Sequence, residues 1–147
     1  MLKLSKKTEY AIIAILDMSS NEKEKLCTAK DLSLKYNIPK DILGKVLQSL
    51  AKKNIITSYQ GVKGGYHLQK SLHQINVNTI ISAVEGPINL VNCNHKELCH
   101  CEQLDYCNIR RPMEFIQLEL TKFFNAITLQ DFKEKYSKII PLIQIQG

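Results

Sequence analysis

Four cysteines lie within one short run of the chain, at Cys93, Cys99, Cys101 and Cys107. His95 and His100 fall inside the same run. The rest of the chain is lysine-rich and lacks the features of a secreted protein. In an intracellular protein, crowded thiols usually hold a metal ion or a cluster rather than form disulfides. The run therefore predicts a site that responds to a metal or to redox state.

Composition limits the class of protein. A chain of 147 residues has room for one domain, or for one domain with an appendage. Charged residues interrupt the N-terminal stretch, so we expect no signal peptide, and no apolar run is long enough to cross a bilayer. The formal net charge of +6 favours an anionic partner, nucleic acid ahead of a membrane surface. We therefore expect a soluble, cytoplasmic protein without a membrane partner.

The first third of the chain has the pattern of three short helices. Two are predicted at about residues 5–18 and 28–36, each beginning at a Ser or Thr whose hydroxyl can cap the helix N-terminus. Asn37 can end the second helix, and Pro39 suits the first turn of a third. The third helix is predicted to bury one face at helical spacing, made of Ile42, Val46, Leu47 and Leu50.

A β-hairpin is predicted next. Residues 55–59 are β-prone, residues 60–65 have the composition of a turn, and residues 66–69 can return as a second strand. Three helices followed by a hairpin with glycines at its tip are the order of a winged helix-turn-helix. The fold class that we expect is therefore mainly α, with a two-stranded wing.

Beyond the hairpin the pattern is helical again. A helix at about 75–84 ends at Gly86–Pro87, and the cysteine loop follows it. Pro112 then opens a long helix, and residues 128–131 resemble a capping box that starts a last short helix.

The predicted third helix has a polar outer face that suits DNA. Its residues are Lys40, Asp41, Lys45 and Gln48. Side chains near the N-terminus of such a helix can reach base edges and phosphates in the major groove. Lys63 would lie at the tip of the hairpin, from which an amine can enter the adjacent minor groove.

The start of the first helix adds to this pattern. Lys6 and Lys7 lie in its first turn, where cations oppose the helix dipole, and a docked phosphate would relieve that mismatch. Each lysine alone is typical of a solvated surface. The three features together favour a double-stranded DNA operator as the partner.

The long helix carries an apolar seam with spacings of three and four, made of Met113, Ile116, Leu120, Phe123 and Ile127. The apolar surface is broadened by Phe115, Leu118 and Phe124. Such a seam suits a facing helix, either from a second copy or from the chain's own N-terminal part. A lone winged helix reads only a few base pairs, so we expect a twofold homodimer held by this helix.

Several segments together resemble the Rrf2 family of winged-helix regulators. They are Leu4–Ala11, Ile38–Pro39 with Leu43–Leu47, Gly61–Tyr66, Val84–Pro87 and Ile127–Leu129. The resemblance covers nearly the whole chain and implies a dimeric repressor or activator. Sensing members of the family bind an iron–sulfur cluster between the DNA-binding and dimerisation elements. The family's wing often has an arginine before its first glycine, and this chain has Gln60 there, which leaves Lys63 as the main contact of the wing.

The resemblance also implies three cysteine ligands, where this chain has four. Cys93 and Cys107 match the family's outer two. Five residues separate Cys93 from Cys99, and five separate Cys101 from Cys107, so spacing alone leaves the middle ligand open. The seven-then-five pattern of RirA-like members matches Cys101, with Cys99 as the alternative. The cluster would be of the 2Fe–2S or the 4Fe–4S type.

The fourth ligand is implied only by analogy within the family. IscR-like members place a histidine three residues after the last cysteine, but here that residue is Arg110, which stays protonated and cannot ligate. NsrR-like members use a carboxylate from the first helix of the other subunit, and Glu9 is the matching residue. Glu9 also suits a purely local role, offsetting the neighbouring lysines. His95, His100 and the spare cysteine are competing ligands.

Other chemistry for the cysteines stays open. Four thiolates suit a structural zinc ion, and close thiols can form a disulfide switch without a metal. Cys27, outside the run, is expected to be a small buried apolar residue. No acid–base pair or phosphate loop stands at a convincing spacing, so we expect neither an enzyme nor a small-molecule substrate.

Together with this resemblance, the sequence predicts a transcriptional repressor whose operator binding responds to iron, nitric oxide, oxygen or redox state through an iron–sulfur cluster. The expected division is a DNA-binding winged helix at residues 1–86, a cluster-binding loop at 87–111, and a dimerisation helix with a C-terminal helix at 112–147.

Overall fold

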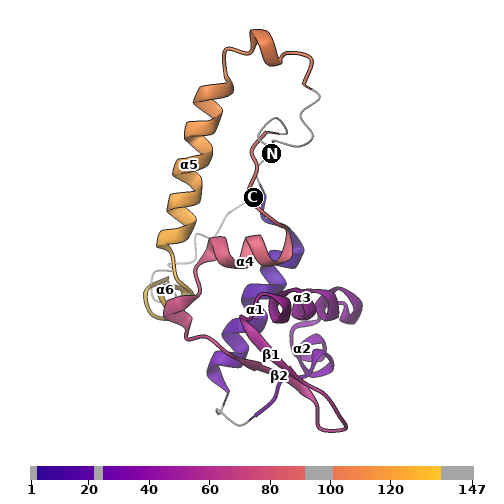
Figure 1. Cartoon of the computed structure of the whole chain (residues 1–147). Coiled ribbons are helices and arrows are strands. Elements are labelled where there is room, and N and C mark those ends of the chain that lie inside the picture. Colours follow the sequence, from indigo (N-terminus) through magenta and orange to yellow (C-terminus); the bar gives the residue numbers. More distant parts are fainter. Residues whose placement is uncertain (1–2, 22–24, 92–100, 137–147) are drawn as a thin grey trace, which may run out of the picture.

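The computed structural model describes residues 3–21, 25–91 and 101–136. Short helices and a β-hairpin form a packed lower part, from which one long helix rises (Figure 1). The helices and strands are α1 Lys6–Ser20, α2 Ala29–Tyr36, α3 Lys40–Lys52, β1 Ile56–Tyr59, β2 Gly65–Leu68, α4 Val77–Val84, α5 Arg110–Ala126 and α6 Leu129–Asp131. The prediction of a mainly α winged helix-turn-helix with a two-stranded wing is confirmed.

Side-chain caps set where several helices begin. The hydroxyls of Ser5, Thr28 and Thr128 accept hydrogen bonds from the backbone N–H groups three residues ahead, at the starts of α1, α2 and α6. These bonds satisfy donors that the first helical turn leaves unpaired. Asn37 ends α2 in the left-handed conformation, with φ of 52°. These starts and this end match the sequence prediction.

The register of α3 differs from the prediction at one position. Ile42, which we expected on the buried face, is 38% exposed, while Leu43 is completely buried. The buried residues are Leu43, Val46, Leu47 and Leu50. They follow the spacing of three and four that places side chains on one stripe of a helix, and Ile42 lies just outside the edge of that stripe.

The wing is an antiparallel pair in which Ile56 lies opposite Leu68 and Tyr59 opposite Gly65. Cys27 joins its edge through two backbone hydrogen bonds with Tyr66, of 2.9 and 2.8 Å. The fit is close, because a Cβ on Gly65 would lie 2.9 Å from the Cys27 carbonyl oxygen. The chain just before α2 is therefore fixed to the wing.

The C-terminal elements return to the packed part. Leu129 of α6 is completely buried in the same core cluster as Ile15, Leu47 and Ile80. Its backbone N–H donates to the Ile75 carbonyl at 2.8 Å. The two ends of α5 are therefore held differently, since only its C-terminal end leads directly into the core.

Two predicted helix starts were wrong by two residues. A short 3-10 turn at Leu72–Gln74 precedes α4, which begins at Val77 rather than Ile75. Helix α5 begins at Arg110, so Pro112 is its third residue. A proline is tolerated there because the N–H groups of the first turn have no partner within the helix. None of the helices in the described ranges has the length and hydrophobicity needed to cross a membrane.

Candidate functional site

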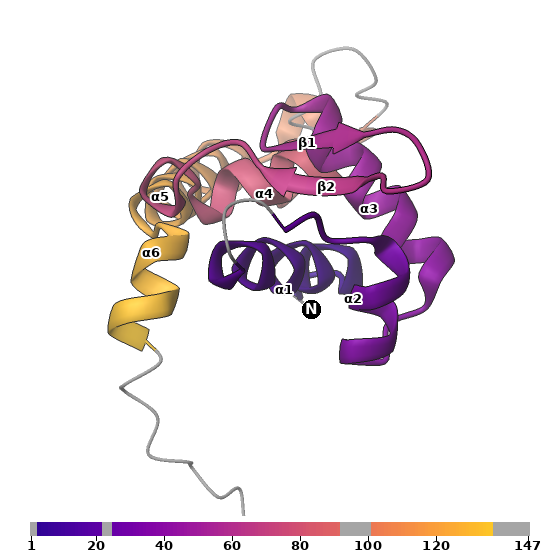
Figure 2. The same ribbon diagram turned by 90° about the horizontal axis from the view of Figure 1, so that it is seen from below.

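The outer face of α3 is polar and accessible to solvent. Lys40, Asp41, Lys45 and Gln48 are all exposed, on the side of the helix away from its buried stripe. Figures 1 and 2 draw α3 and the hairpin towards the right of the molecule, with α5 and α6 towards the left. The four predicted contact residues of α3 thus lie together on one surface, as a recognition helix requires.

The tip of the wing is also exposed. The turn that joins β1 to β2 carries Gln60, Val62 and Lys63, all accessible to solvent. Gly61 has φ of 118°, and its carbonyl accepts a 2.9 Å hydrogen bond from the N–H of Gly64. This conformation, which a side chain would strain, holds Lys63 at a narrow turn.

The first turn of α1 is less positive than the sequence suggested. Lys6 and Lys7 are exposed, but Lys6 Nζ lies 2.6 Å from Glu9 Oε2. The hydrogen bond and the charge of Glu9 raise the pKa of Lys6. Glu9 thus has the local role that the sequence allowed for it, and Lys7 is left as the more available of the two cations.

Two of the four clustered cysteines lie in the described part of the chain. Cys101 and Cys107 are half-buried free thiols on either side of the 3-10 turn Leu104–Tyr106. Cys93 and Cys99 lie outside the described residues, as do His95 and His100. Within the described ranges, no three His, Cys, Asp or Glu side chains gather as metal ligands. The donor chemistry still fits, because thiolates are preferred ligands of iron–sulfur clusters and of zinc.

A single chain does not bring Glu9 to these thiols. Cys101 and Cys107 precede the N-terminal end of α5, at the top of Figure 1. The start of α1 lies beside the other half of α5, where Ser5 and Thr8 line the same pocket as Leu120. Arg110 and Leu120 are separated by about 15 Å of helix. A ligand role for Glu9 therefore requires a second subunit.

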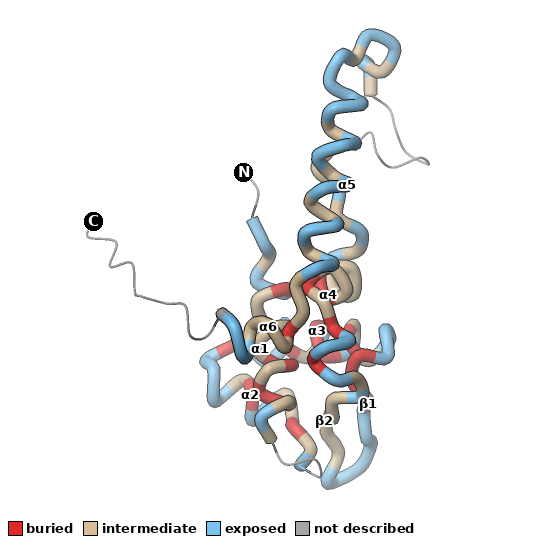
Figure 3. The backbone as a smooth tube through the Cα atoms, turned by 90° about the vertical axis from the view of Figure 1, so that its left-hand side faces the viewer, coloured by how far each residue is buried: buried red, intermediate tan, exposed pale blue. Residues whose placement is uncertain are grey.

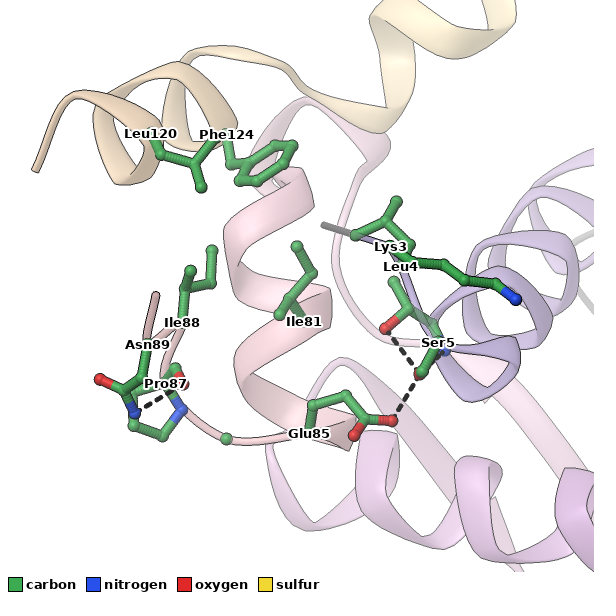
Figure 4. A pocket seen from close by; sticks show the side chains of 12 residues that line it. Lys3, Leu4, Ser5, Ile81, Glu85, Pro87, Ile88, Asn89, Leu120 and Phe124 are labelled. Carbon is green, nitrogen blue, oxygen red and sulfur yellow. Dashed lines mark hydrogen bonds between the residues drawn. The ribbon is translucent and has the colours of Figure 1, made fainter. Parts of the chain in front are cut away.

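The pocket between α1, α4 and α5 was not expected from the sequence (Figure 4). It has a volume of about 380 Å³ and an apolar wall that includes Ile81, Leu120 and Phe124. On its rim the Ser5 hydroxyl donates to Glu85 Oε1 at 2.5 Å. The segment just before the cysteine loop is thus attached to the start of α1.

A buried carboxylate in the winged helix was also missed. Asp17 accepts hydrogen bonds from Lys35, Tyr36 and Asn21, and it forms an ion pair with Lys35. Burial alone would raise the pKa of Asp17, but the hydrogen bonds from Lys35 and Tyr36 and the charge of Lys35 outweigh it and lower the pKa. Cys27 is buried as expected and accepts a 2.8 Å hydrogen bond from Asn21, and burial raises the pKa of its thiol.

Comparisons with known proteins agree with this architecture. The model of the Rrf2 family, described as an iron-dependent transcriptional regulator, matches residues 4–135. The regulator IscR of Pectobacterium carotovorum is 30% identical over 130 residues, which are 88% of this chain and 78% of that protein. The regulator NsrR of Bacillus licheniformis is 28% identical over 130 residues, covering 88% of this chain and 91% of that protein.

Solved structures show the same fold. The structure of CymR, the global cysteine regulator of B. subtilis, has a TM-score of 0.67 at 23% identity, covering 90% of this chain and 96% of that one. A transcriptional regulator from Listeria innocua has a TM-score of 0.72 at 20% identity, covering 99% and 93%. The named relatives are transcriptional regulators, which confirms the prediction that the chain is not an enzyme.

Proposed function

The chain belongs to the Rrf2 family of transcriptional regulators, and we propose that it is a cytoplasmic homodimeric repressor controlled by an iron–sulfur cluster. Membership of this family supports the regulation of transcription through DNA binding. The control by a cluster, the dimer and the individual contact residues are proposed from the residues of this chain.

The proposed DNA interface has three parts. Helix α3 enters the major groove with Lys40, Asp41, Lys45 and Gln48. Gln60 and Lys63 of the wing reach the adjacent minor groove. Lys7, with Lys6 beside it, contacts a phosphate near the start of α1. All these side chains are exposed, and their charges and lengths suit phosphates and base edges.

The proposed dimer uses the surface of α5 that the chain itself leaves uncovered. Phe115, Ile116, Leu118 and Phe123 are exposed large apolar side chains on this helix. An apolar surface of this kind on one helix is typical of an interaction site. Leu120 and Phe124 face the chain's own pocket, so the seam expected from the sequence is shared between internal packing and the proposed partner.

The cysteine loop is the proposed cluster site, with Cys93, Cys107 and Cys101 as ligands and Cys99 as the alternative to Cys101. Cys101 and Cys107 are free thiols flanking a single turn, which supports this ligand set. When bound, the cluster supplies a centre that reacts to iron supply, oxygen, nitric oxide or redox state. The loop joins α4 to α5, so its residues lie between the proposed DNA-reading and dimerising elements.

A twofold dimer would also explain a ligand role for Glu9. If two copies of α5 pack antiparallel, the N-terminal end of one helix lies beside the C-terminal end of the other. The partner's α1 begins near that C-terminal end, so its Glu9 would approach the first subunit's cysteine loop. Glu9 would have to leave Lys6, and an exposed ion pair of this kind is weak enough to be exchanged.

Contacts at the start of the loop give a route to the DNA-reading elements. Glu85 accepts the hydrogen bond of Ser5, which caps α1, and the Leu90 N–H donates to Gln117 Oε1 of α5 at 3.1 Å. A change in the loop would therefore displace both α1 and α5. In a dimer this would alter the spacing of the two α3 helices relative to the operator.

The observation that carries the proposal is the pair of free thiols on the loop between the winged helix and the uncovered α5. The test is anaerobic purification followed by visible absorbance and iron, sulfide and zinc analysis. Wild-type protein should be coloured and contain iron and sulfide. Cys93→Ala and Cys107→Ala should lose the normal cluster, whereas only one of Cys99→Ala and Cys101→Ala should.

Cys27→Ala is the matched control, because Cys27 is buried in the winged helix and is not part of the loop. It should keep the full complement of iron and sulfide. Stoichiometric zinc without sulfide would reject the sensor in favour of a structural zinc site. A metal-free protein whose loop cysteines form a disulfide would reject it in favour of a thiol switch.

A further inference from the structure

Helix α3 contains a half-buried glycine, Gly44, away from both ends of the helix. Gly44 is the fifth residue of Lys40–Lys52 and has ordinary helical backbone angles, since the only glycines with positive φ in the described ranges are Gly61 and Gly86. A helix with glycine in its interior is less stable than the same helix with alanine there, because glycine gives the unfolded chain more conformational freedom to lose on folding. Glycine at this position therefore costs the helix stability.

Among the described residues, no contact within the chain requires a glycine at this position. A Cβ built on Gly44 would meet no atom within 4 Å in the described structure. The glycines of the wing differ in this respect, because a Cβ on Gly64 would lie 2.5 Å from the Tyr59 carbonyl oxygen. Gly44 therefore serves neither a special backbone conformation nor a close internal contact.

Gly44 lies in the same row of α3 as two residues that we propose to contact DNA. The residues one turn before and one turn after it are Lys40 and Gln48, both exposed and both on the proposed DNA-reading face. The buried stripe of α3 begins at the neighbouring Leu43. Gly44 thus leaves a notch, one side chain deep, in the row between two polar side chains.

We propose that Gly44 is a specificity-determining residue of the DNA interface. The notch lets the backbone of α3 come into van der Waals contact with the major-groove edge of one base pair, while Lys40 and Gln48 reach to either side. A methyl group at this position would hold the helix away from that base pair. The inference rests on the proposed role of α3 in the major groove and adds the residue that sets how closely the helix approaches.

The test selects binding sites for the anaerobically purified wild type and for Gly44→Ala from a random double-stranded DNA library. Gly44→Ala should unfold about 3 °C higher, because alanine favours the helix. It should bind the wild-type consensus at least 10-fold more weakly and change the preferred base at one position in each half-site. A higher unfolding temperature with weaker, altered recognition is not expected of a merely structural residue.

Ala51→Gly is the matched control on the same helix. Ala51 lies seven residues, about 10 Å, further along the helix than Gly44, away from the end that enters the groove. It should unfold at a lower temperature and keep the wild-type base preference. Altered preference in Ala51→Gly would overturn the proposal, because helix stability would then explain both results.

Unchanged affinity and base preference in Gly44→Ala would also overturn it, as would a uniform loss of affinity with the same consensus. Lys45→Ala shows whether such a result rejects only the role of Gly44 or the proposed DNA-reading role of α3 as a whole. If Lys45→Ala weakens binding while Gly44→Ala does not, only the role of Gly44 is rejected. If the wild type selects no consensus and Lys45→Ala has no effect, the DNA-reading role of α3 is itself wrong.

Discussion

The winged helix and the long α5 differ in how completely one chain covers them. In the winged helix, Leu43, Val46, Leu47 and Leu50 of α3 are at most 1% exposed. Helix α5 is longer, with 17 residues, yet none of them is buried. Phe115 and Phe123 are 63% and 58% exposed, and Figure 3 shows the helix rising from the packed part with its residues coloured exposed or half-buried.

This difference indicates that the winged helix is stabilised by its own core, whereas the apolar face of α5 needs a partner to cover it. The winged helix has its own core and can hold α3 and the wing in place before DNA binds. The apolar face of α5 contributes to stability only when something covers it. We expect a second copy to do so, and the following predictions test the contrast from the largest effect to the smallest.

The largest effect is expected from charges on α5. Ile116→Glu with Phe123→Glu should raise the dissociation constant of the dimer at least 100-fold, because each carboxylate would be buried in the interface without a partner. Sedimentation at several concentrations measures this. The winged helix should remain folded, as judged by circular dichroism.

Lys122→Ala is the control for this pair, because Lys122 is exposed on the same helix and forms an ion pair with Glu119 of α5 itself, at 2.8 Å. It should leave the dimer intact. A glutamate double variant that stays dimeric would show that α5 is not the interface, and the contrast between the two regions would need another explanation.

A smaller effect is expected inside the winged helix. Asp17→Asn should lower the free energy of unfolding by about 2 kcal/mol, because it removes the charge that Lys35, Tyr36 and Asn21 surround. Urea denaturation measures the change. Asp105→Asn, at an exposed residue of the cysteine loop, should change stability by less than about 0.5 kcal/mol. Equal losses of unfolding free energy in Asp17→Asn and Asp105→Asn would contradict the view that the winged helix is stabilised by its own internal contacts.

Local signals in the sequence were enough for part of the structure. Ser5, Thr28 and Asn37 were identified as helix ends because capping involves residues only a few positions apart. The wing followed from its glycines and its β-prone flanks. The exposure of Ile42 was missed because two stripes, one residue apart, both fit an apolar pattern in α3.

The remainder depends on contacts between distant residues. Asp17, Cys27 and Lys35 meet only after α1, α2 and the wing have packed, and no spacing in the sequence marks them as a group. The division of α5 into an inward face at Leu120 and an exposed face at Phe123 likewise depends on where α4 lies. The ligand set of the cysteine loop stays a prediction, since only Cys101 and Cys107 lie in the described ranges.

A substitution on the outer face of α3 should weaken DNA binding without changing stability or dimerisation. Lys45→Ala should reduce the slope of log affinity against log salt concentration by about one unit if Lys45 contacts a phosphate. A base contact should instead cost about 1–3 kcal/mol at one position of the site. Fluorescence anisotropy over a series of salt concentrations distinguishes them. Lys122→Ala, on α5, is the control and should bind like the wild type; an unchanged slope and affinity in Lys45→Ala would remove α3 from the interface.

The smallest effect concerns pH and is again confined to the winged helix. The pKa of Asp17 is lowered in the folded protein, so its contribution to stability is complete above the ordinary aspartate pKa of about 3.9 and is lost as the pH falls through the folded value. Its neighbours Lys35, Tyr36 and Cys27 have raised pKa values and keep their protons throughout the acid range, so Asp17 alone among them titrates there. The difference in unfolding free energy between wild type and Asp17→Asn should therefore be constant from about pH 7 to pH 5 and shrink below about pH 4. Urea denaturation of both proteins at each pH measures it, with the dimer state checked in parallel. A difference that stays constant down to pH 3 would mean that the charge of Asp17 contributes nothing, and that packing alone makes the winged helix independent of a partner.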